Sequence, residues 1–259
     1  MPAGVLRGVA TRLHRARTTL LIACLTTFVA LPLQAGVLIS ATRFIYAADQ
    51  QEIGLTLANR GKLPVLVKAW IDEGDPSIAA ERLKPPFLLT PPLARVDAGG
   101  EQAYRLRYTG VAGALPQDRE SLFWINLLEV PPSPPEESDG QATLQLAFQY
   151  RLKLFYRPAG LSGDPGDAAR GLRWSVASSR RQLVAENDAP YHVSLGRLAL
   201  AFGSGETELP PATIAPRSRT PFELPEDAVS SQGELSIRYA WIDDWGGLAT
   251  IDKPIARLR

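Results

Sequence analysis

Histidine and cysteine are scarce in this sequence of 259 residues, which has two histidines and one cysteine. That scarcity leaves little material for zinc sites or for cysteine–histidine catalysis. A formal net charge of +1 gives no support to a nucleic-acid binder that works through bulk positive charge. Proline, in contrast, is abundant, with 22 residues. Because proline breaks helices and crowds turns, the composition favours many short strands over a helical bundle.

The first 35 residues have the features of a secretory signal peptide. Four arginines precede an apolar stretch, Leu20–Leu33, and the segment contains no acidic residue. Leu33-Gln34-Ala35 then offers a small-residue cleavage site. The apolar stretch has 14 residues, fewer than the ~20 that span a bilayer, which disfavours an uncleaved anchor. We therefore expect residues 1–35 to be removed and the mature chain to begin near Gly36.

Removal of this segment changes both the charge and the cysteine count. The segment holds 4 of the 28 basic residues, so 24 basic residues remain against 27 acidic ones, a net charge near −3. Cys24 is lost with it, and His192 is the only histidine that remains. An exported chain without cysteine must fold through core burial alone, with no disulfide bond.

The mature chain has the pattern of an all-β protein. Strand-like runs rich in β-branched, leucine and aromatic residues alternate with turn formers, and no segment keeps a helical apolar period over three turns. We expect strands at Val37–Tyr46, Ile53–Asn59, Val65–Ile71, Tyr104–Tyr108, Leu122–Val130, Leu172–Ser178, Gln182–Ala185, His192–Phe202, Glu234–Trp241 and Leu248–Ile251.

Two breaks organise these strands. The proline-rich segment Pro131–Gly140 could be a domain linker, but strand-like sequence resumes directly after it, so we interpret it as a hairpin loop. The glycine-rich segment Pro158–Ala169 is the better domain boundary. The sequence thus predicts an N-terminal domain over residues 36–158 and a C-terminal domain over 159–259, each with the size and strand count of an immunoglobulin-like β-sandwich.

From Leu144 onward the residues alternate between two faces, with Leu144, Leu146, Phe148, Tyr150 and Leu152 on one face and Gln145, Ala147, Gln149, Arg151 and Lys153 on the other. Continued to Tyr156, such a strand would have 13 residues, which exceeds the usual range of ~3–10. One interpretation is a long core strand whose end is misjudged. The other is a strand whose apolar edge is offered to a partner for β-augmentation.

Several short segments then resemble one family in order and spacing, the periplasmic pilus chaperones of the chaperone–usher pathway. The resemblance covers essentially the whole mature chain, and the segments that carry it are Thr42-Arg43, Leu115–Ser121, Leu122–Leu127, Lys153–Pro158, Pro190-Tyr191 and Asp244–Gly247. It implies two immunoglobulin-like sandwiches that meet at an angle and leave a cleft between them.

The resemblance also implies roles for individual residues. Arg43 and Lys153 match a basic pair that grips the C-terminal carboxylate of a pilus subunit. An arginine fork and an ammonium suit that ligand, because a chain end carries a fixed negative charge. The donor strand, which would fill the open groove of the subunit, is implied to consist of Leu144, Leu146 and Phe148.

Lys153 has the opposite parity along the strand to those three apolar residues. Either a bulge or a site on the other face of the strand would reconcile them. Tyr150 and Leu152 continue the apolar parity and are candidates for the protein's own core. Three further charged residues match family positions that link the two domains through salt bridges: Glu120, Arg157 and Asp244.

The function expected from the resemblance is that of a periplasmic chaperone. It would bind pilus or fimbrial subunits by donor-strand complementation and deliver them to an outer-membrane usher. No catalysis, cofactor, metal ion, nucleic acid or small-molecule substrate is expected, because binding supplies a missing strand and no bond is made. An exposed apolar strand edge also favours self-capping dimers of the free protein.

Two other classes of function compete with this one. An enzyme would need paired carboxylates, such as Asp243-Asp244 or Glu136-Glu137, or a nucleophile such as Ser204. Adjacent carboxylates of a strand, however, point to opposite faces and cannot act on one bond together. Ser204 lacks the nucleophile-elbow spacing, and His192 fits a half-buried structural residue. The other competitor is a secreted two-domain adhesive or carbohydrate-binding module, which would not need Arg43 and Lys153 to converge.

Overall fold

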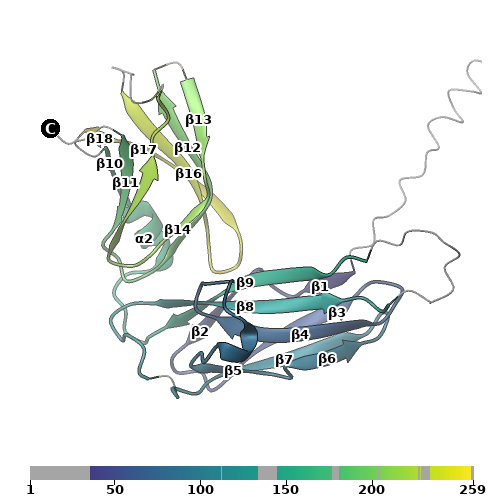
Figure 1. Ribbon diagram of the computed structural model, residues 1–259. Helices are drawn as coiled ribbons and strands as arrows, with labels where there is room; N and C mark the ends of the chain where they lie inside the picture. The colour runs from purple at the N-terminus through teal and green to yellow at the C-terminus, as the bar shows by residue number, and fades with distance from the viewer. Residues whose placement is uncertain are drawn as a thin grey trace, which may run out of the picture. The chain divides into compact units, whose positions relative to one another are not determined.

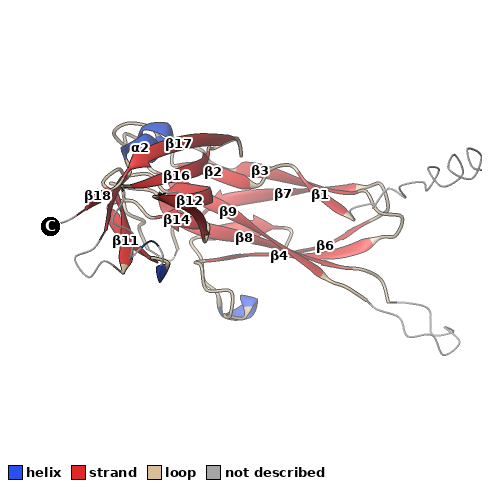
Figure 2. Ribbon diagram, turned by 90° about the horizontal axis from the view of Figure 1, so that it is seen from above, coloured by secondary structure: helices blue, strands red, loops and turns tan. Residues whose placement is uncertain are grey.

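The computed structural model describes residues 36–111, 113–133, 145–176, 181–203, 205–226, 228 and 234–257. The regular structure of these residues is almost entirely strand, as Figure 2 shows. The strands form four sheets that pack in pairs (Figure 1). The all-β prediction is confirmed. The predicted signal peptide, residues 1–35, lies outside the described residues.

The first sandwich contains a four-stranded and a five-stranded sheet. The four-stranded sheet has, in spatial order, β1 (Val37–Ile39), β3 (Ile53–Asn59), β7 (Glu101–Tyr108) and β5 (Phe87–Thr90). The five-stranded sheet has β2 (Arg43–Ala47), β9 (Phe148–Arg157), β8 (Ser121–Val130), β4 (Val65–Asp72) and β6 (Leu93–Val96). A short 3-10 helix, η1 (Ala80–Arg82), lies between β4 and β5.

The core of the first sandwich lies between these two sheets. Leu57 of one sheet and Val67, Ile125 and Leu127 of the other have no exposed surface and belong to one hydrophobic cluster. Their alternation with more exposed residues follows the period of two that a strand imposes. An aromatic group closes the end of the core where β2 and β9 pair, with members Tyr46, Phe87, Tyr108, Phe123 and Tyr156.

The second sandwich also consists of two sheets. One has the order β15 (Ser218–Glu223), β11 (Gln182–Asn187), β10 (Arg173–Val176) and β18 (Ala256–Arg257). The other has the order β13 (Gly205–Leu209), β12 (Val193–Phe202), β16 (Leu235–Ile242) and β17 (Leu248–Pro254), with β14 (Ala212–Ile214) also paired to β12. Its core cluster shares no residue with that of the first sandwich.

The predicted strand Val37–Tyr46 is wrong as a single element. It is two strands, β1 and β2, which belong to different sheets. Between them, the Ser40 N–H donates to the carbonyl of Thr56 at 3.0 Å, and the chain then crosses to the other sheet. An apolar pattern alone does not distinguish one long strand from two short ones that change sheet.

The segment Pro158–Ala169, predicted as a domain boundary, also contains a helix that was not predicted from the sequence. It contains the start of helix α2 (Pro165–Gly171), with Asp164 as N-cap and Pro165 at the first helical position. The Asp164 carboxylate accepts a hydrogen bond from the Asp167 N–H at 2.7 Å. The Asp-Pro pair was a usable signal, but a helix of seven residues is too short to show a 3.6-residue period.

The hairpin interpretation of the proline-rich segment is confirmed. Strands β8 and β9 pair antiparallel on either side of it, from Ser121 opposite Tyr156 to Glu129 opposite Phe148. Strand β9 nevertheless begins at Phe148, not at Leu144 as predicted. Residues 145–147 form no strand, because the pairing with β8 ends at Phe148 and leaves them no ladder to join. Leu144 lies outside the described residues.

Candidate functional site

Arg43 and Lys153 lie side by side in the structure. Strands β2 and β9 pair in parallel, and Arg43 is the register partner of Lys153. Their chain neighbours Phe44 and Leu154 point into the core of the first sandwich. Because successive side chains of a strand alternate, both basic side chains point away from that core.

Arg43 is buried without a counter-ion. Its exposed fraction is 8%, and its Nη1 donates to the carbonyl of Ile242 in the second sandwich at 2.8 Å. Its Nε is buried and has no hydrogen-bond partner. Burial lowers the pKa of Arg43 below its ordinary value, although the more distant carboxylates of Asp244 and Asp243 oppose this shift. No carboxylate of the described residues comes within 4.0 Å of its guanidinium.

Lys153 is held by neutral groups only. Its Nζ donates to the hydroxyl of Ser194 at 2.9 Å and to that of Thr213. It also lies 5.7 Å from the centre of the Trp124 ring. Burial, together with the charge of Arg43, lowers the pKa of Lys153 to about 8. Arg43, which is buried, and Lys153, which is partly buried, are adjacent cations without a carboxylate partner, and such a site favours an anionic ligand.

The opposite parity of Lys153 and the apolar residues of β9 is explained by a site on the other face of the strand and not by a bulge. The ladder between β8 and β9 is continuous from Phe148 to Tyr156, without a bulge. Lys153 therefore reaches its partners from the face opposite to the core. Tyr150 and Leu152, on the other face, pack against the core of the first sandwich, which confirms their predicted role.

One edge of β9 is free over half of its length. On one side β9 pairs with β8 throughout, but on the other side β2 covers only Lys153–Arg157. Within the described chain, residues 148–152 thus present unpaired backbone N–H and C=O groups at that edge. Two apolar side chains stand at its start, Leu146 with 53% and Phe148 with 54% of their surface exposed.

Glu120, Arg157 and Asp244 form one connected ion-pair network. The Arg157 guanidinium contacts Glu120 through Nε at 2.7 Å and Asp244 through Nη1 and Nη2 at 2.7 and 2.9 Å. Burial acts to lower the pKa of Arg157, but its bonds to Asp244 and Glu120 outweigh that effect and raise it. The network joins the two sandwiches, because Asp244 follows β16 while Arg157 ends β9.

His192 extends this network. Its backbone N–H donates to Glu120 Oε2 at 2.8 Å, and its Nδ1 lies 3.3 Å from the same oxygen. The imidazole also packs against the Phe155 ring in a tilted arrangement, with 5.5 Å between the ring centres. The residue is tied to a structural carboxylate, in agreement with the prediction that it is a half-buried structural residue.

Sequence reasoning missed a second buried ion pair beside Lys153. Asp72 is buried and accepts hydrogen bonds from Arg151 at 2.7 Å and from Asn126 at 2.7 Å. Burial acts to raise the pKa of Asp72, but these bonds outweigh it, and the pKa lies below its ordinary value. The Arg151 guanidinium lies 4.3 Å from the centre of the Trp124 ring. The only signal in the sequence was that Arg151 and Lys153 share one face of their strand.

The carboxylates considered for an enzyme are already occupied. Asp243 accepts hydrogen bonds from the backbone N–H groups of Trp245 and Gly247, at 2.9 and 2.7 Å. Asp244 is paired with Arg157. Glu136, Glu137 and Ser204 lie outside the described residues.

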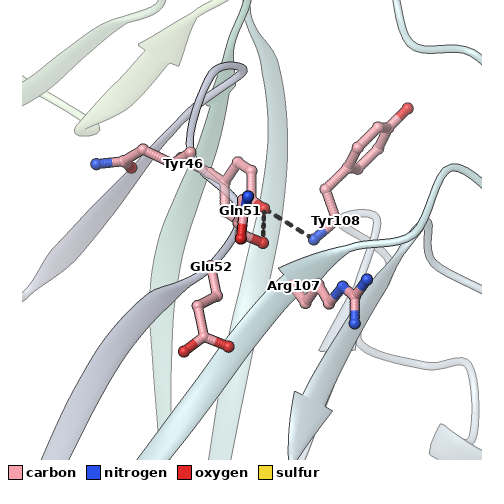
Figure 3. Close-up of a pocket in the computed structure, with 6 residues that line it drawn as sticks. Tyr46, Gln51, Glu52, Arg107 and Tyr108 are labelled. Atoms are coloured by element: carbon pink, nitrogen blue, oxygen red, sulfur yellow. Dashed lines mark hydrogen bonds between the residues drawn. The ribbon is translucent and has the colours of Figure 1, made fainter.

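A hollow of about 460 Å³ opens elsewhere, next to the aromatic group of the first sandwich. Figure 3 shows its lining, where the Tyr46 hydroxyl donates to the Gln51 carbonyl at 2.8 Å and accepts from the Tyr108 N–H at 3.1 Å. Neither Arg43 nor Lys153 lines it. Across the described residues, no group of three or more potential metal ligands occurs. In the same part of the chain, no helix is long and apolar enough to cross a membrane.

Comparison with protein families identifies the chain. Residues 36–162 match the N-terminal domain of PapD, described as a pili and flagellar-assembly chaperone, and residues 167–253 match the C-terminal domain of the same pili assembly chaperone. The chain belongs to this family of pilus chaperones. The predicted resemblance is confirmed, and the family favours a chaperone over an adhesive module.

Individual relatives agree with the family assignment. Chaperone protein FimB/FhaD of Bordetella pertussis is 40% identical over 226 residues, which cover 86% of this chain and 89% of that protein. The probable fimbrial chaperone YadV of Escherichia coli is 44% identical over 67% of this chain and 69% of its own. A crystal structure of YadV has a TM-score of 0.72 with 36% identity and covers 85% of this chain and all of that one. The chain of a Salmonella enterica complex between the SafA pilin and the SafB chaperone has a TM-score of 0.68 with 29% identity, over 84% of this chain and 95% of that one.

Proposed function

We propose that this protein is a periplasmic chaperone that captures pilus subunits by their C-terminal carboxylate and completes their fold with the free edge of β9. The observation that carries the proposal is the pair Arg43 and Lys153. Both are basic, Arg43 is buried and Lys153 is partly buried, and neither has a carboxylate partner within 4.0 Å among the described residues. A terminal carboxylate supplies the missing negative charge.

The geometry suits a chain terminus. Arg43 has a buried Nε without a partner, and Lys153 bonds only hydroxyl groups. A carboxylate has two oxygens, so one can accept from the guanidinium and the other from the ammonium. Because each basic residue is anchored to the second sandwich, through the Ile242 carbonyl and the Ser194 hydroxyl, the pair is held in place before a ligand arrives.

The carboxylate would also set the register of the strand that follows. Lys153 lies at the point where β2 stops covering β9, and the free edge runs from there to Phe148. A subunit segment anchored at Lys153 can therefore pair its backbone with residues 148–152. Register matters, because a shift of one residue would turn every side chain to the other face. Leu146 and Phe148, and Leu144 before them, would then fill apolar pockets of the subunit.

The relatives support this partner and this location. One similar structure is that of a chaperone bound to a pilin, and another is described as a periplasmic chaperone, SfaE, with 27% identity and a TM-score of 0.63. A signal peptide over residues 1–35 would bring the chain to that compartment. An outer-membrane usher would receive the subunit, and a neighbouring subunit would displace β9. In the free protein, the same exposed edge would favour self-capping dimers.

The test is co-expression with the subunits encoded nearby, followed by pull-down from the periplasm. Wild type should retain a subunit, whereas Arg43→Ala and Lys153→Ala should not. Arg95→Ala is a matched control, because Arg95 is an exposed arginine of the same sandwich that pairs with Asp97 at its surface. Normal capture by both anchor variants would overturn the proposed site.

A further inference from the structure

Glu129 is a buried acid that the proposed subunit site does not use. Its exposed fraction is 6%. It shares the inward parity of Ile125 and Leu127 on β8, so its side chain enters the end of the first sandwich's core. Its backbone pairs with Phe148, at the start of the free strand edge. An ionised carboxylate in such a place is costly unless a cation or several donors compensate it.

The described residues compensate this carboxylate only in part. Oε2 accepts a hydrogen bond from the Tyr150 hydroxyl at 3.1 Å. Tyr150 is a neutral donor, since burial and the nearby Glu129 raise its pKa to about 12. No lysine, arginine or histidine of the described residues lies within 4.0 Å of the carboxylate. The second oxygen, Oε1, points to a different neighbour.

That neighbour is Gly36. A Cβ placed on Gly36 would lie only 2.5 Å from Oε1 of Glu129, so the backbone of Gly36 and this carboxylate are in close contact. The Gly36 carbonyl accepts hydrogen bonds from the N–H groups of Arg60 and Gly61, at 2.7 and 3.1 Å, so the residue is fixed in place. The Gly36 nitrogen and this hypothetical Cβ would both be bonded to the Gly36 Cα, which places the two atoms about 2.5 Å apart. The nitrogen therefore lies within about 5 Å of Oε1.

We propose that removal of the signal peptide after Ala35 creates the missing cation, because the new α-ammonium group of Gly36 pairs with Glu129. This rests on the cleavage site proposed above and is independent of the carboxylate anchor. Before cleavage the Gly36 nitrogen belongs to a neutral amide. After cleavage it carries a positive charge and three hydrogens, and rotation about the N–Cα bond can direct one to Oε1.

The pair would close one end of the first sandwich. Gly36 leads into β1 in one sheet, and Glu129 belongs to β8 in the other, so the ion pair joins the two sheets. Glu129 also holds the Tyr150 hydroxyl on β9. The ion pair formed after export and cleavage would thereby stabilise β9, whose free edge is proposed to pair with a subunit. A larger residue at this position would force the Glu129 carboxylate to move.

The reactivity of the Gly36 α-amine tests the pair directly. The exported wild type and a Glu129→Gln variant are treated with acetic anhydride near neutral pH, and the N-terminal peptide is quantified by mass spectrometry. An ion pair that raises the pKa of the amine by one unit makes acetylation about tenfold slower in the folded wild type than in the variant. Glu81→Gln is the control, because Glu81 forms an exposed pair with Lys68. It should not change the rate.

A second variant covers the case in which Glu129→Gln does not fold. One serine added before Gly36 moves the α-amine away and leaves Glu129 in place, so the added amine should react about tenfold faster than that of wild type. Equal rates in folded wild type and in either variant would overturn the proposal, as would a mature chain that does not begin at Gly36. The anchor variant Arg43→Ala should lose subunit capture but keep the slow wild-type rate, which separates this inference from the proposed function.

Discussion

Two arginines lie where the sandwiches meet, and their surroundings differ in one respect. Arg157 has carboxylates on both sides, Glu120 and Asp244, at hydrogen-bond distance. Arg43 is more deeply buried than Arg157 but donates to a carbonyl and keeps an unpartnered Nε. The first arginine is complete within the folded chain, and the second lacks an anion. A buried charge that the protein compensates serves the fold, whereas one that it leaves uncompensated serves a ligand.

The largest expected effect is on subunit binding by Arg43→Ala. Removal of one member of a buried charge pair costs roughly 2–5 kcal/mol in an interface, so we expect binding to weaken about 1000-fold. The stability of the free chaperone should not fall, because the variant leaves no carboxylate unpaired. Subunit affinity from titration and the urea midpoint of the free protein measure the two effects. An Arg43→Ala variant with lower stability but normal subunit affinity would show instead that Arg43 stabilises the fold and does not bind the subunit.

Arg157→Ala should show the opposite pattern. It leaves Glu120 buried without its arginine partner, so the free energy of unfolding should fall by about 3 kcal/mol. Asp244→Ala removes the more exposed partner and should cost less. Urea denaturation of the free protein checks both. If Arg157→Ala abolished subunit binding without loss of stability, the two arginines would have the same role.

Substitution of the exposed apolar residues at the start of β9 has the third-largest expected effect. Phe148→Ser or Leu146→Ser removes apolar surface that a subunit would bury, worth about 1.5–3 kcal/mol each, or roughly 10- to 100-fold in affinity. Leu88→Ser is the control, because Leu88 is equally exposed but belongs to β5 in the other sheet. Equal affinities for the three variants would show that this part of β9 is not the contact.

The smallest effect is the pH dependence set by Lys153. With its pKa lowered to about 8, Lys153 loses its charge between pH 7 and 9, and subunit affinity should fall by about tenfold. The folded chain binds fewer protons here than the unfolded chain, so its stability should rise with pH over the same range. Lys153→Met should abolish both trends. A wild-type affinity that stays constant to pH 9 would contradict the uncompensated charge.

The sequence predicted the two-sandwich fold and the residues of the site better than it predicted their surroundings. Arg43 and Lys153 were found through short motifs, and alternation in β9 placed Tyr150 and Leu152 in the core. Nothing in the sequence shows that the Ser194 hydroxyl and the Ile242 carbonyl would hold these cations, because those contacts join residues 41 and 199 positions apart. Asp72 and Arg151, 79 positions apart, were missed for the same reason.

The predictions of individual strands and helices were wrong where the apolar pattern of the sequence is short. Strands β1 and β2 were merged because the apolar run continues across the change of sheet. Helix α2 was missed because it has only two turns' worth of residues, and the start of β9 was placed too early because strand length depends on a partner. Each error depends on which strand or sheet lies next to the segment in the folded protein. The periodicity of the sequence carries no information about that neighbour.

Binding of a terminal carboxylate by Arg43 and Lys153 is tested most directly by amidation of that terminus. The C-terminal segment of a captured subunit is prepared as the free acid and as the amide, and the affinity of each for the chaperone is measured by calorimetry. We predict that wild type binds the amide about 100-fold more weakly, whereas Arg43→Ala binds both forms equally weakly. Equal affinity of wild type for acid and amide would contradict the account.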